Sequence, residues 1–121
     1  MLLDIVKKLE YKSDLERLKT LKNILKNKKI KFSVQNYKYL AFKGTNIIVD
    51  VGNLKSKKHI ILSAHFDVVS GSPGANDDAS GIAILIDVIE KLRKLKLKNI
   101  IRVIFFDDEE IGRFGSISYI K

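Results

Sequence analysis

Apolar residues recur at helical spacing along the first 30 residues of the chain. Within residues 2–9 they fall on one face, and a second series follows after a polar break. Ser13 and Glu16 form a capping box that marks the start of the second helix. In this motif each side chain accepts a hydrogen bond from the backbone amide of the other residue. Asn27 and the lysines after it mark its end. Two amphipathic helices are therefore predicted, with these apolar faces: Leu2, Ile5, Val6 and Leu9, then Leu15, Leu18, Leu21, Ile24 and Leu25.

The pattern changes to that of β-strands in residues 31–51. Phe32 and Val34 alternate with polar residues, and residues 45–51 are rich in β-branched side chains. Lys43-Gly44 separates the two stretches, and Gly52-Asn53 follows as a turn. We therefore predict two strands that break near Lys43-Gly44.

Residues 60–106 show the order strand, helix, strand. Ile60-Ile61-Leu62 and residues 100–106 are continuous apolar runs, which are typical of strands covered on both faces. Between them a broad apolar helical face begins near Ala79, with Asn76, Asp77 and Asp78 as candidate caps. This spacing predicts a βαβ unit with two parallel strands and a right-handed crossover. The apolar positions of the helix are Ile82, Leu85, Ile86, Val88, Ile89, Leu92 and Leu95.

Length and composition indicate a single globular domain. A chain of 121 residues with 45% hydrophobic and 31% charged residues is typical of one globular domain. Asp4 interrupts the first apolar patch, which argues against a secretory signal, and no apolar run is long enough to span a bilayer. We expect a cytoplasmic location and no membrane partner. The net charge of +9 comes from lysines spread over helix faces without interleaved aromatic residues, so we expect no nucleic-acid partner.

The residues that suit catalysis cluster after the two predicted parallel strands. His65 and Asp67 follow the first strand, and residues 107–110 supply four acids after the second. Asp77 and Asp78 precede the connecting helix, which must begin at the same edge. Sites in open α/β sheets form at this edge, outside the carboxyl ends of the strands. His59, at the other end of its strand, is expected to lie far from this edge, and Asp107 and Asp108 are expected to be solvated loop acids.

Acidic side chains gathered in this way repel one another unless a cation lies among them. Carboxylates with one imidazole suit Zn²⁺, with Mn²⁺ or Co²⁺ as alternatives. A pair of such ions polarises a carbonyl and lowers the pKa of a bridging water, and a further carboxylate is then needed to accept the proton. The chemistry predicted from these residues is metal-dependent hydrolysis.

Three motifs, AHFD, SPGANDDASG and FFDDEEIGRFGS, resemble those of the zinc aminopeptidases of peptidase family M28. The resemblance covers roughly residues 58–119. It implies an α/β fold with a mixed β-sheet and flanking helices, described as zinc-exopeptidase-like or phosphorylase/hydrolase-like. It also implies a di-zinc aminopeptidase whose substrate is a peptide with a free N-terminus.

The resemblance assigns roles to five residues. His65 and Glu110 match terminal ligands of the two metals, and Asp77 matches the carboxylate that bridges them. Asp67 matches the acid that orients the histidine, and Glu109 matches the general base. The Asp77–Asp78 peptide bond matches one that is cis in the family.

One departure from the family pattern concerns the remaining ligands. Family members supply a further aspartate and a further histidine, whereas no aspartate follows Asp108 here and no histidine follows His65. Each ion would then have two protein ligands, fewer than the three of a typical catalytic zinc. We therefore expect residues 1–121 to form a single partial, truncated peptidase domain. Its parts are an N-terminal region of helices and strands (1–57) and the metal-site segment (58–121). Metal binding should be weak, activity small or absent, and one sheet edge exposed.

Three other interpretations stay open. HFDVV and DEEIG also resemble the M20 peptidases and deacylases, although there the bridging aspartate lies further from the first histidine. Glutaminyl cyclases share the M28 scaffold with a single zinc. A metal-free remnant or interaction module of the same fold would lack catalysis altogether. The native metal, the preferred N-terminal residue and the oligomeric state are not determined by the sequence.

Overall fold

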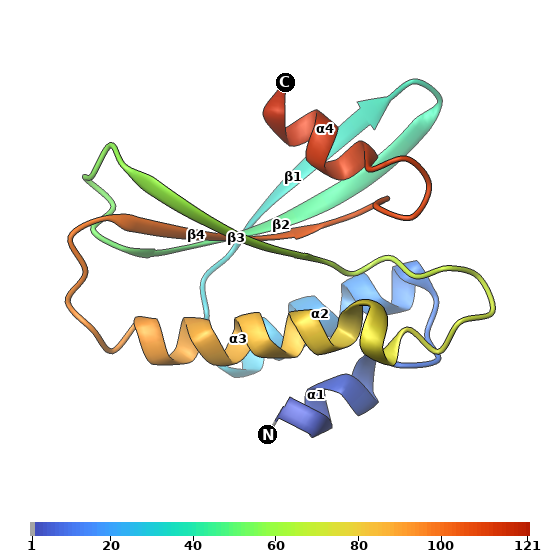
Figure 1. Ribbon diagram of the computed structural model, residues 1–121, viewed down its shortest axis with the longest axis horizontal. Helices are drawn as coiled ribbons and strands as arrows, with labels where there is room; N and C mark the ends of the chain where they lie inside the picture. The colour runs from blue at the N-terminus through green and yellow to red at the C-terminus, as the bar shows by residue number, and fades with distance from the viewer. Residues whose placement is uncertain (1) are drawn as a thin grey trace.

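A four-stranded mixed sheet forms the centre of the molecule. The computed structural model describes residues 2–121, with helices α1, α2 and α3 on one side of the sheet and α4 on the other (Figure 1). In chain order the elements are α1 (Leu2–Leu9), α2 (Asp14–Asn27), β1 (Ser33–Tyr39), β2 (Phe42–Gly52), β3 (His59–His65), the single π-helical turn η1 (Ala75–Ala79), α3 (Ser80–Leu92), β4 (Ile100–Phe106) and α4 (Phe114–Ile120).

The strands lie in the order β1-β2-β4-β3. β3 and β4 are parallel, in a register that pairs His59 with Ile100 and His65 with Phe106. β2 runs antiparallel to both of its neighbours. The predicted α/β fold with a mixed sheet is therefore confirmed, as is the parallel pairing within the βαβ unit. Because β3 and β4 end in register, the loops that follow them start side by side.

The hydrophobic core fills the space between the sheet and helices α1 to α3. The capping box at the start of α2 is present, with the Ser13 hydroxyl 3.2 Å from the amide nitrogen of Glu16 and the Glu16 carboxylate 3.3 Å from that of Ser13. The predicted apolar face of α2 packs against the core through Leu21, Ile24 and Leu25. The fully buried hydrophobic residues are Leu9, Leu21, Leu25, Ile47, Ala79, Ile82, Ile86, Val103, Ile104 and Phe105.

Some details of the predicted elements are wrong. Leu15 is 77% exposed, because it lies in the first turn of α2 beyond the edge of the core. The β1–β2 turn falls at Leu40 and Ala41, and β2 runs straight through Lys43-Gly44. Leu95 lies beyond the end of α3 and is exposed.

Strand β3 departs furthest from its prediction. Ile60 and Ile61 are 52% and 49% exposed, so the apolar run is not covered on both faces. β3 is an edge strand: within residues 2–121 it pairs with β4, and no other strand pairs with its second edge. The expectation of an exposed sheet edge is met here.

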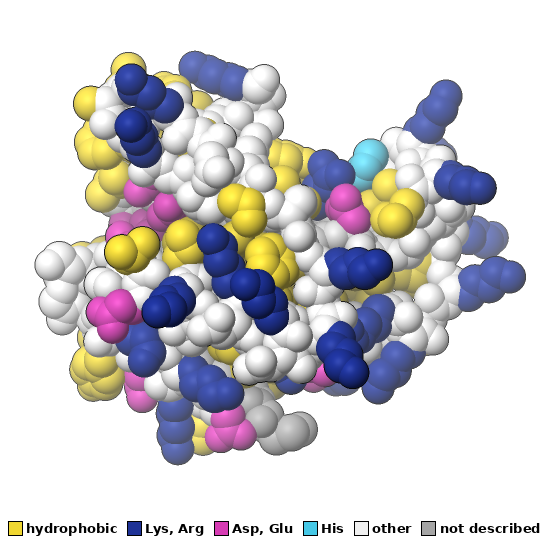
Figure 2. All heavy atoms as spheres, turned by 180° about the vertical axis from the view of Figure 1, so that it is seen from behind, with side chains coloured by type: hydrophobic (Ala, Val, Ile, Leu, Met, Phe, Trp, Pro, Cys, Tyr) yellow, Lys and Arg dark blue, Asp and Glu magenta, His cyan; other side chains and the backbone are white. Residues whose placement is uncertain are grey.

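Positive charge is dispersed over the face of the molecule that Figure 2 shows. Figure 2 shows lysine and arginine side chains spread over the face of the molecule opposite to the view of Figure 1, without a single dense patch. Among the helices within residues 2–121, none is long and apolar enough to cross a bilayer.

Candidate metal site

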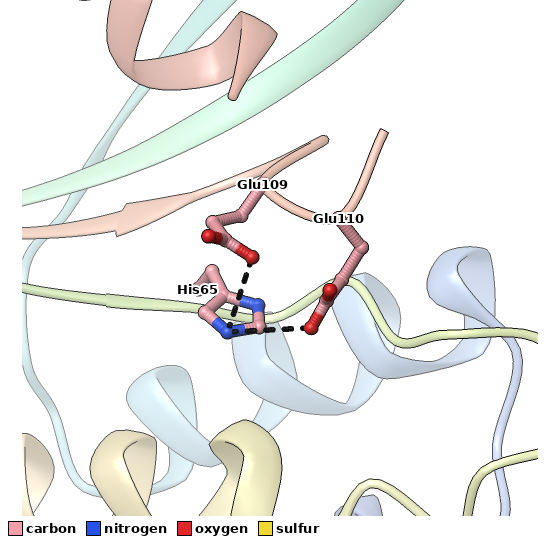
Figure 3. A group of neighbouring side chains, drawn as sticks. All are labelled: His65, Glu109 and Glu110. Atoms are coloured by element: carbon pink, nitrogen blue, oxygen red, sulfur yellow. Dashed lines mark ion pairs between the residues drawn. The ribbon is translucent and has the colours of Figure 1, made fainter. Parts of the chain in front are cut away.

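Three segments that are distant in sequence meet at the carboxyl ends of β3 and β4. His65 is the last residue of β3, Asp77 lies in the turn η1 before α3, and Glu109 and Glu110 lie in the loop after β4. The Nε2 atom of His65 is 3.0 Å from Asp77 Oδ1, 3.7 Å from Glu109 Oε2 and 3.8 Å from Glu110 Oε1. Figure 3 shows the imidazole and the two glutamates facing one another.

These separations suit ligands of one cation. Two donor atoms that each lie about 2.1 Å from a tetrahedral zinc are about 3.4 Å apart, and the distances from His65 Nε2 lie on either side of this value. The donor atoms of His65, Glu109 and Glu110 all lie within 4.8 Å of one another. The side chains present therefore fit a divalent ion with small adjustments of rotamer.

Without a cation, the neighbouring carboxylates favour the protonated forms of His65 and Glu110. Burial alone would lower the pKa of His65, but hydrogen bonds with Asp67 and Asp77 raise it to about 9. Burial and the neighbouring acids, Asp77 and Glu109, raise the pKa of Glu110. A proton on His65 therefore balances part of the negative charge of these acids, and any cation that binds the imidazole has to displace it.

Asp67 connects the histidine to the loop after β4. Its side chain is 2% exposed, and Oδ1 lies 3.3 Å from His65 Nδ1. Its two oxygens accept hydrogen bonds from the backbone amides of Glu109, at 3.0 Å, and Glu110, at 2.9 Å. Burial raises the pKa of Asp67, but the bonds from His65 and from these two amides hold it below its usual value. One buried carboxylate thus orients the imidazole and the backbone of both glutamates.

Asp77 and Asp78 contact different groups of His65, the imidazole and the backbone amide. The peptide bond between them is cis, as the family resemblance implies. Asp77 faces His65, whereas Asp78 Oδ2 accepts a hydrogen bond from the backbone amide of His65 at 3.2 Å. The prediction that Asn76, Asp77 or Asp78 caps α3 is wrong, because these residues lie within η1 and Ala79 occupies the N-cap position. Asp78 instead connects η1 to the end of β3.

Asp107 and Asp108 are not the solvated loop acids that the sequence suggested. Asp107 accepts hydrogen bonds from the amides of Thr45, at 3.0 Å, and Asp108, at 2.9 Å, and burial raises its pKa to about 6. Asp108 accepts a hydrogen bond from the Tyr37 hydroxyl at 2.5 Å, and burial raises its pKa as well. These acids connect the loop after β4 to β1 and β2.

Two residues of α2 were not anticipated as part of the site. Arg17 is fully buried and donates hydrogen bonds to the carbonyls of Phe66 at 2.5 Å, Leu9 at 2.9 Å and Gly74 at 3.4 Å. Asp14 accepts a hydrogen bond from the amide of Val68 at 2.8 Å. Apart from Leu9, their partners lie 49 to 57 positions further along the chain, so no local pattern could have indicated these contacts. His59, as expected, is an exposed residue at the far end of β3.

A sequence profile of peptidase family M28 matches residues 46–121 of the chain. The chain belongs to peptidase family M28. Aminopeptidase YwaD of Bacillus subtilis is 37% identical over 68 residues, which are 56% of this chain and 15% of that protein. Aminopeptidase Y of Saccharomyces cerevisiae is 38% identical over 82 residues, which are 67% of this chain and 15% of that protein.

Solved structures agree with the family assignment. A zinc aminopeptidase of Bacillus subtilis, 32% identical, superimposes with a TM-score of 0.62 over 68% of this chain and 21% of its own. A glutaminyl cyclase of Porphyromonas gingivalis gives a TM-score of 0.72 over 94% of this chain and 45% of its own; at 22% identity this likeness concerns the fold alone. The chain thus spans about 15% of the length of the two curated relatives and carries the M28 motifs within that span.

Proposed function

We propose that this chain carries part of the active site of a zinc-dependent aminopeptidase that acts on peptides with a free N-terminus. The convergence of Asp77 and Glu110 on His65 is the observation that supports this most strongly, since their carboxylate oxygens lie 3.0 Å and 3.8 Å from the imidazole Nε2. The names of the matched relatives support the same reaction class. Cytoplasmic location and independence from nucleic acid and membrane remain predictions from the sequence.

In this proposal His65, Asp77 and Glu110 would hold the metal, and Asp77 would serve as a ligand of both ions. Asp67 holds His65 through Nδ1, which leaves Nε2 directed at the metal position. Bound zinc would supply a Lewis acid that polarises the scissile carbonyl and acidifies the attacking water. Glu109 would accept the proton of that water and pass it to the leaving amine, since its carboxylate borders the cluster and is 42% exposed.

A single ion is the alternative arrangement. His65, Glu109 and Glu110 alone can surround one cation, because their donor atoms lie within 4.8 Å of one another. In that case Glu109 is a ligand and is not free to act as the base. Co²⁺ or Mn²⁺ would fit the same oxygen and nitrogen donors. The number of bound ions therefore distinguishes the two arrangements.

The test is a metal titration of the 121-residue chain after treatment with a chelator. We expect zinc to bind and to raise the melting temperature, and we expect Asp77→Ala and Glu110→Ala each to abolish most of this effect. Glu109→Gln should retain zinc under the two-ion assignment. Asp87→Asn, on the exposed face of α3 beside Lys91, is the matched control and should leave binding unchanged.

Two results would contradict the proposal. If zinc neither binds nor changes the melting temperature, the metal-free remnant is the better interpretation. If Glu109→Gln loses zinc as completely as Glu110→Ala does, the single-ion set applies and Glu109 is not the base. Peptidase turnover belongs to the complete active site, and we expect Glu109→Gln to abolish it there.

A further inference from the structure

The side chain of Arg17 contacts the backbone of two segments that carry the candidate site, at the residue after His65 and at the start of the turn that holds Asp77. This side chain of α2 is fully buried. Its guanidinium donates hydrogen bonds to three backbone carbonyls, those of Phe66, Leu9 and Gly74. Burying a guanidinium is costly unless its donors are satisfied and charge of the opposite sign is near. Its position therefore calls for a reason beyond packing.

The first reason lies in the two residues next to Asp67. Arg17 Nε donates to the carbonyl of Phe66, and Asp14 Oδ1 accepts from the amide of Val68. Asp14 and Arg17 are three residues apart and so lie on one face of α2. Together they hold the backbone on both sides of Asp67, the carboxylate that orients His65 and accepts the amides of Glu109 and Glu110.

The second reason lies at Gly74, where the turn that carries Asp77 begins. Both terminal nitrogens of Arg17 lie 3.4 Å from the Gly74 carbonyl, which also accepts the amide of Ala79 at 3.1 Å. Gly74 has a φ of +68°, and a Cβ there would meet Arg17 Nη1 at 2.5 Å. The glycine thus permits the guanidinium to lie directly against the backbone that leads into η1.

Charge supports the same arrangement. Burial lowers the pKa of Arg17, and the carboxylates of Asp14, Asp67, Asp78 and Asp77 oppose that change. The guanidinium is therefore a buried positive charge within electrostatic reach of the acidic cluster. It offsets part of the repulsion between acids that must stay close together when no cation is bound.

We infer that Arg17, assisted by Asp14, is a positioning residue for the metal site, which makes α2 part of its framework. The guanidinium fixes the distance between the Phe66–Val68 loop and the Gly74–Asp78 turn, and thereby the distance between His65 and Asp77. α2 precedes residues 46–121, the part that matches the family profile. The inference rests on the proposed metal-binding function, and its test separates the two.

Arg17→Lys is the main variant, because lysine keeps the charge but concentrates its donors on one nitrogen, which cannot serve Phe66 and Gly74 together. Arg102→Lys is the matched control: Arg102 also makes two hydrogen bonds with one partner, Asp50, on the β2–β4 pair away from the site. Asp14→Ala is the second variant, since Asp14 is exposed and its loss should not prevent folding.

Two measurements follow for each protein. The first is zinc affinity, where removing an orienting interaction lowers affinity by about 10- to 100-fold. We expect such a loss in Arg17→Lys and less than about twofold change in Arg102→Lys. The second, made without metal, is hydrogen exchange of the amides of His65, Glu109 and Glu110, with Val103 in the core of β4 as a reference for global stability.

We expect exchange of the three site amides to accelerate at least about tenfold in Arg17→Lys, and more weakly in Asp14→Ala, beyond any change at Val103. A general loss of stability would accelerate Val103 equally, and that result would overturn the inference. Unchanged zinc affinity together with unchanged exchange would overturn it as well. If the wild-type chain binds no zinc, the proposed function fails, and the exchange measurement alone decides the role of Arg17. If Arg17→Lys does not fold, unchanged exchange at Glu109 and Glu110 in Asp14→Ala refutes the positioning role, and accelerated exchange there supports it.

Discussion

Replacing Asp67 by asparagine tests the central contact of the site. The two carboxylate oxygens of Asp67 each accept one backbone amide, from Glu109 and from Glu110. An asparagine offers one carbonyl oxygen and one NH₂ group, so one of these amides must face another donor. The side chain is 2% exposed, and water therefore has little room to replace the lost acceptor.

The expected cost follows from these contacts. A buried amide left without a partner costs about 1–3 kcal/mol. The charge-assisted contact with His65 Nδ1 becomes a neutral one, which loses about 1 kcal/mol more. We therefore expect Asp67→Asn to lower the free energy of unfolding by about 2–4 kcal/mol, and to weaken zinc binding by about 10- to 100-fold because the charged partner that orients His65 becomes a neutral one.

Urea unfolding at pH 7 with a chelator present measures the first effect. At a slope of about 2 kcal/mol per molar urea, the middle of the range for small proteins, this loss lowers the midpoint by about 1–2 M. Asp87→Asn is the control, because its ion pair with Lys91 is exposed and contributes about 0.5 kcal/mol at most. If the Asp67→Asn midpoint falls no further than that of the control, Asp67 does not hold the Glu109–Glu110 backbone and the reasoning is wrong.

Three other predictions concern different parts of the molecule. With its pKa raised from 6.5 to about 9 in the folded state, His65 contributes stability that is present below pH 6.5 and lost as pH rises through 9. Urea titrations of the metal-free chain should show a decline of up to about 3 kcal/mol over this range, and an equal decline in His65→Gln would contradict it. Gly44→Ala should destabilise the chain by about 1–3 kcal/mol, since the new Cβ would collide with the Tyr37 ring and lie 2.6 Å from Asp108 Oδ2; thermal unfolding checks this, and an unchanged melting temperature would refute it. Ile60→Lys on the open edge of β3 should slow aggregation, measured by light scattering, more than Ile84→Lys on the exposed face of α3 does; equal effects would mean that the edge is not the site of association.

Much of the local structure could be predicted because its causes are local. The periodicity of apolar residues and the Ser13–Glu16 capping box located α2, and the strand, helix, strand order implied the parallel β3–β4 pair. That parallel pair places the ends of two strands at one edge, so the meeting of His65 with Glu109 and Glu110 followed from topology before any distance was known.

Tertiary structure alone decided which side chains are covered and which distant groups they bind. The Ile60-Ile61 run is exposed because β3 has one neighbour, a fact of strand order that the composition of the run does not contain. Asp108 bonds to Tyr37 across 71 positions of sequence, and Arg17 reaches Gly74 across 57. Hydrogen bonds of this kind depend on where folding brings two segments together, whereas helices and turns depend on neighbours along the chain. For this protein, the sequence indicated which residues are candidate metal ligands, and the packing of α2 and the β1–β2 hairpin around them determined how those residues are held.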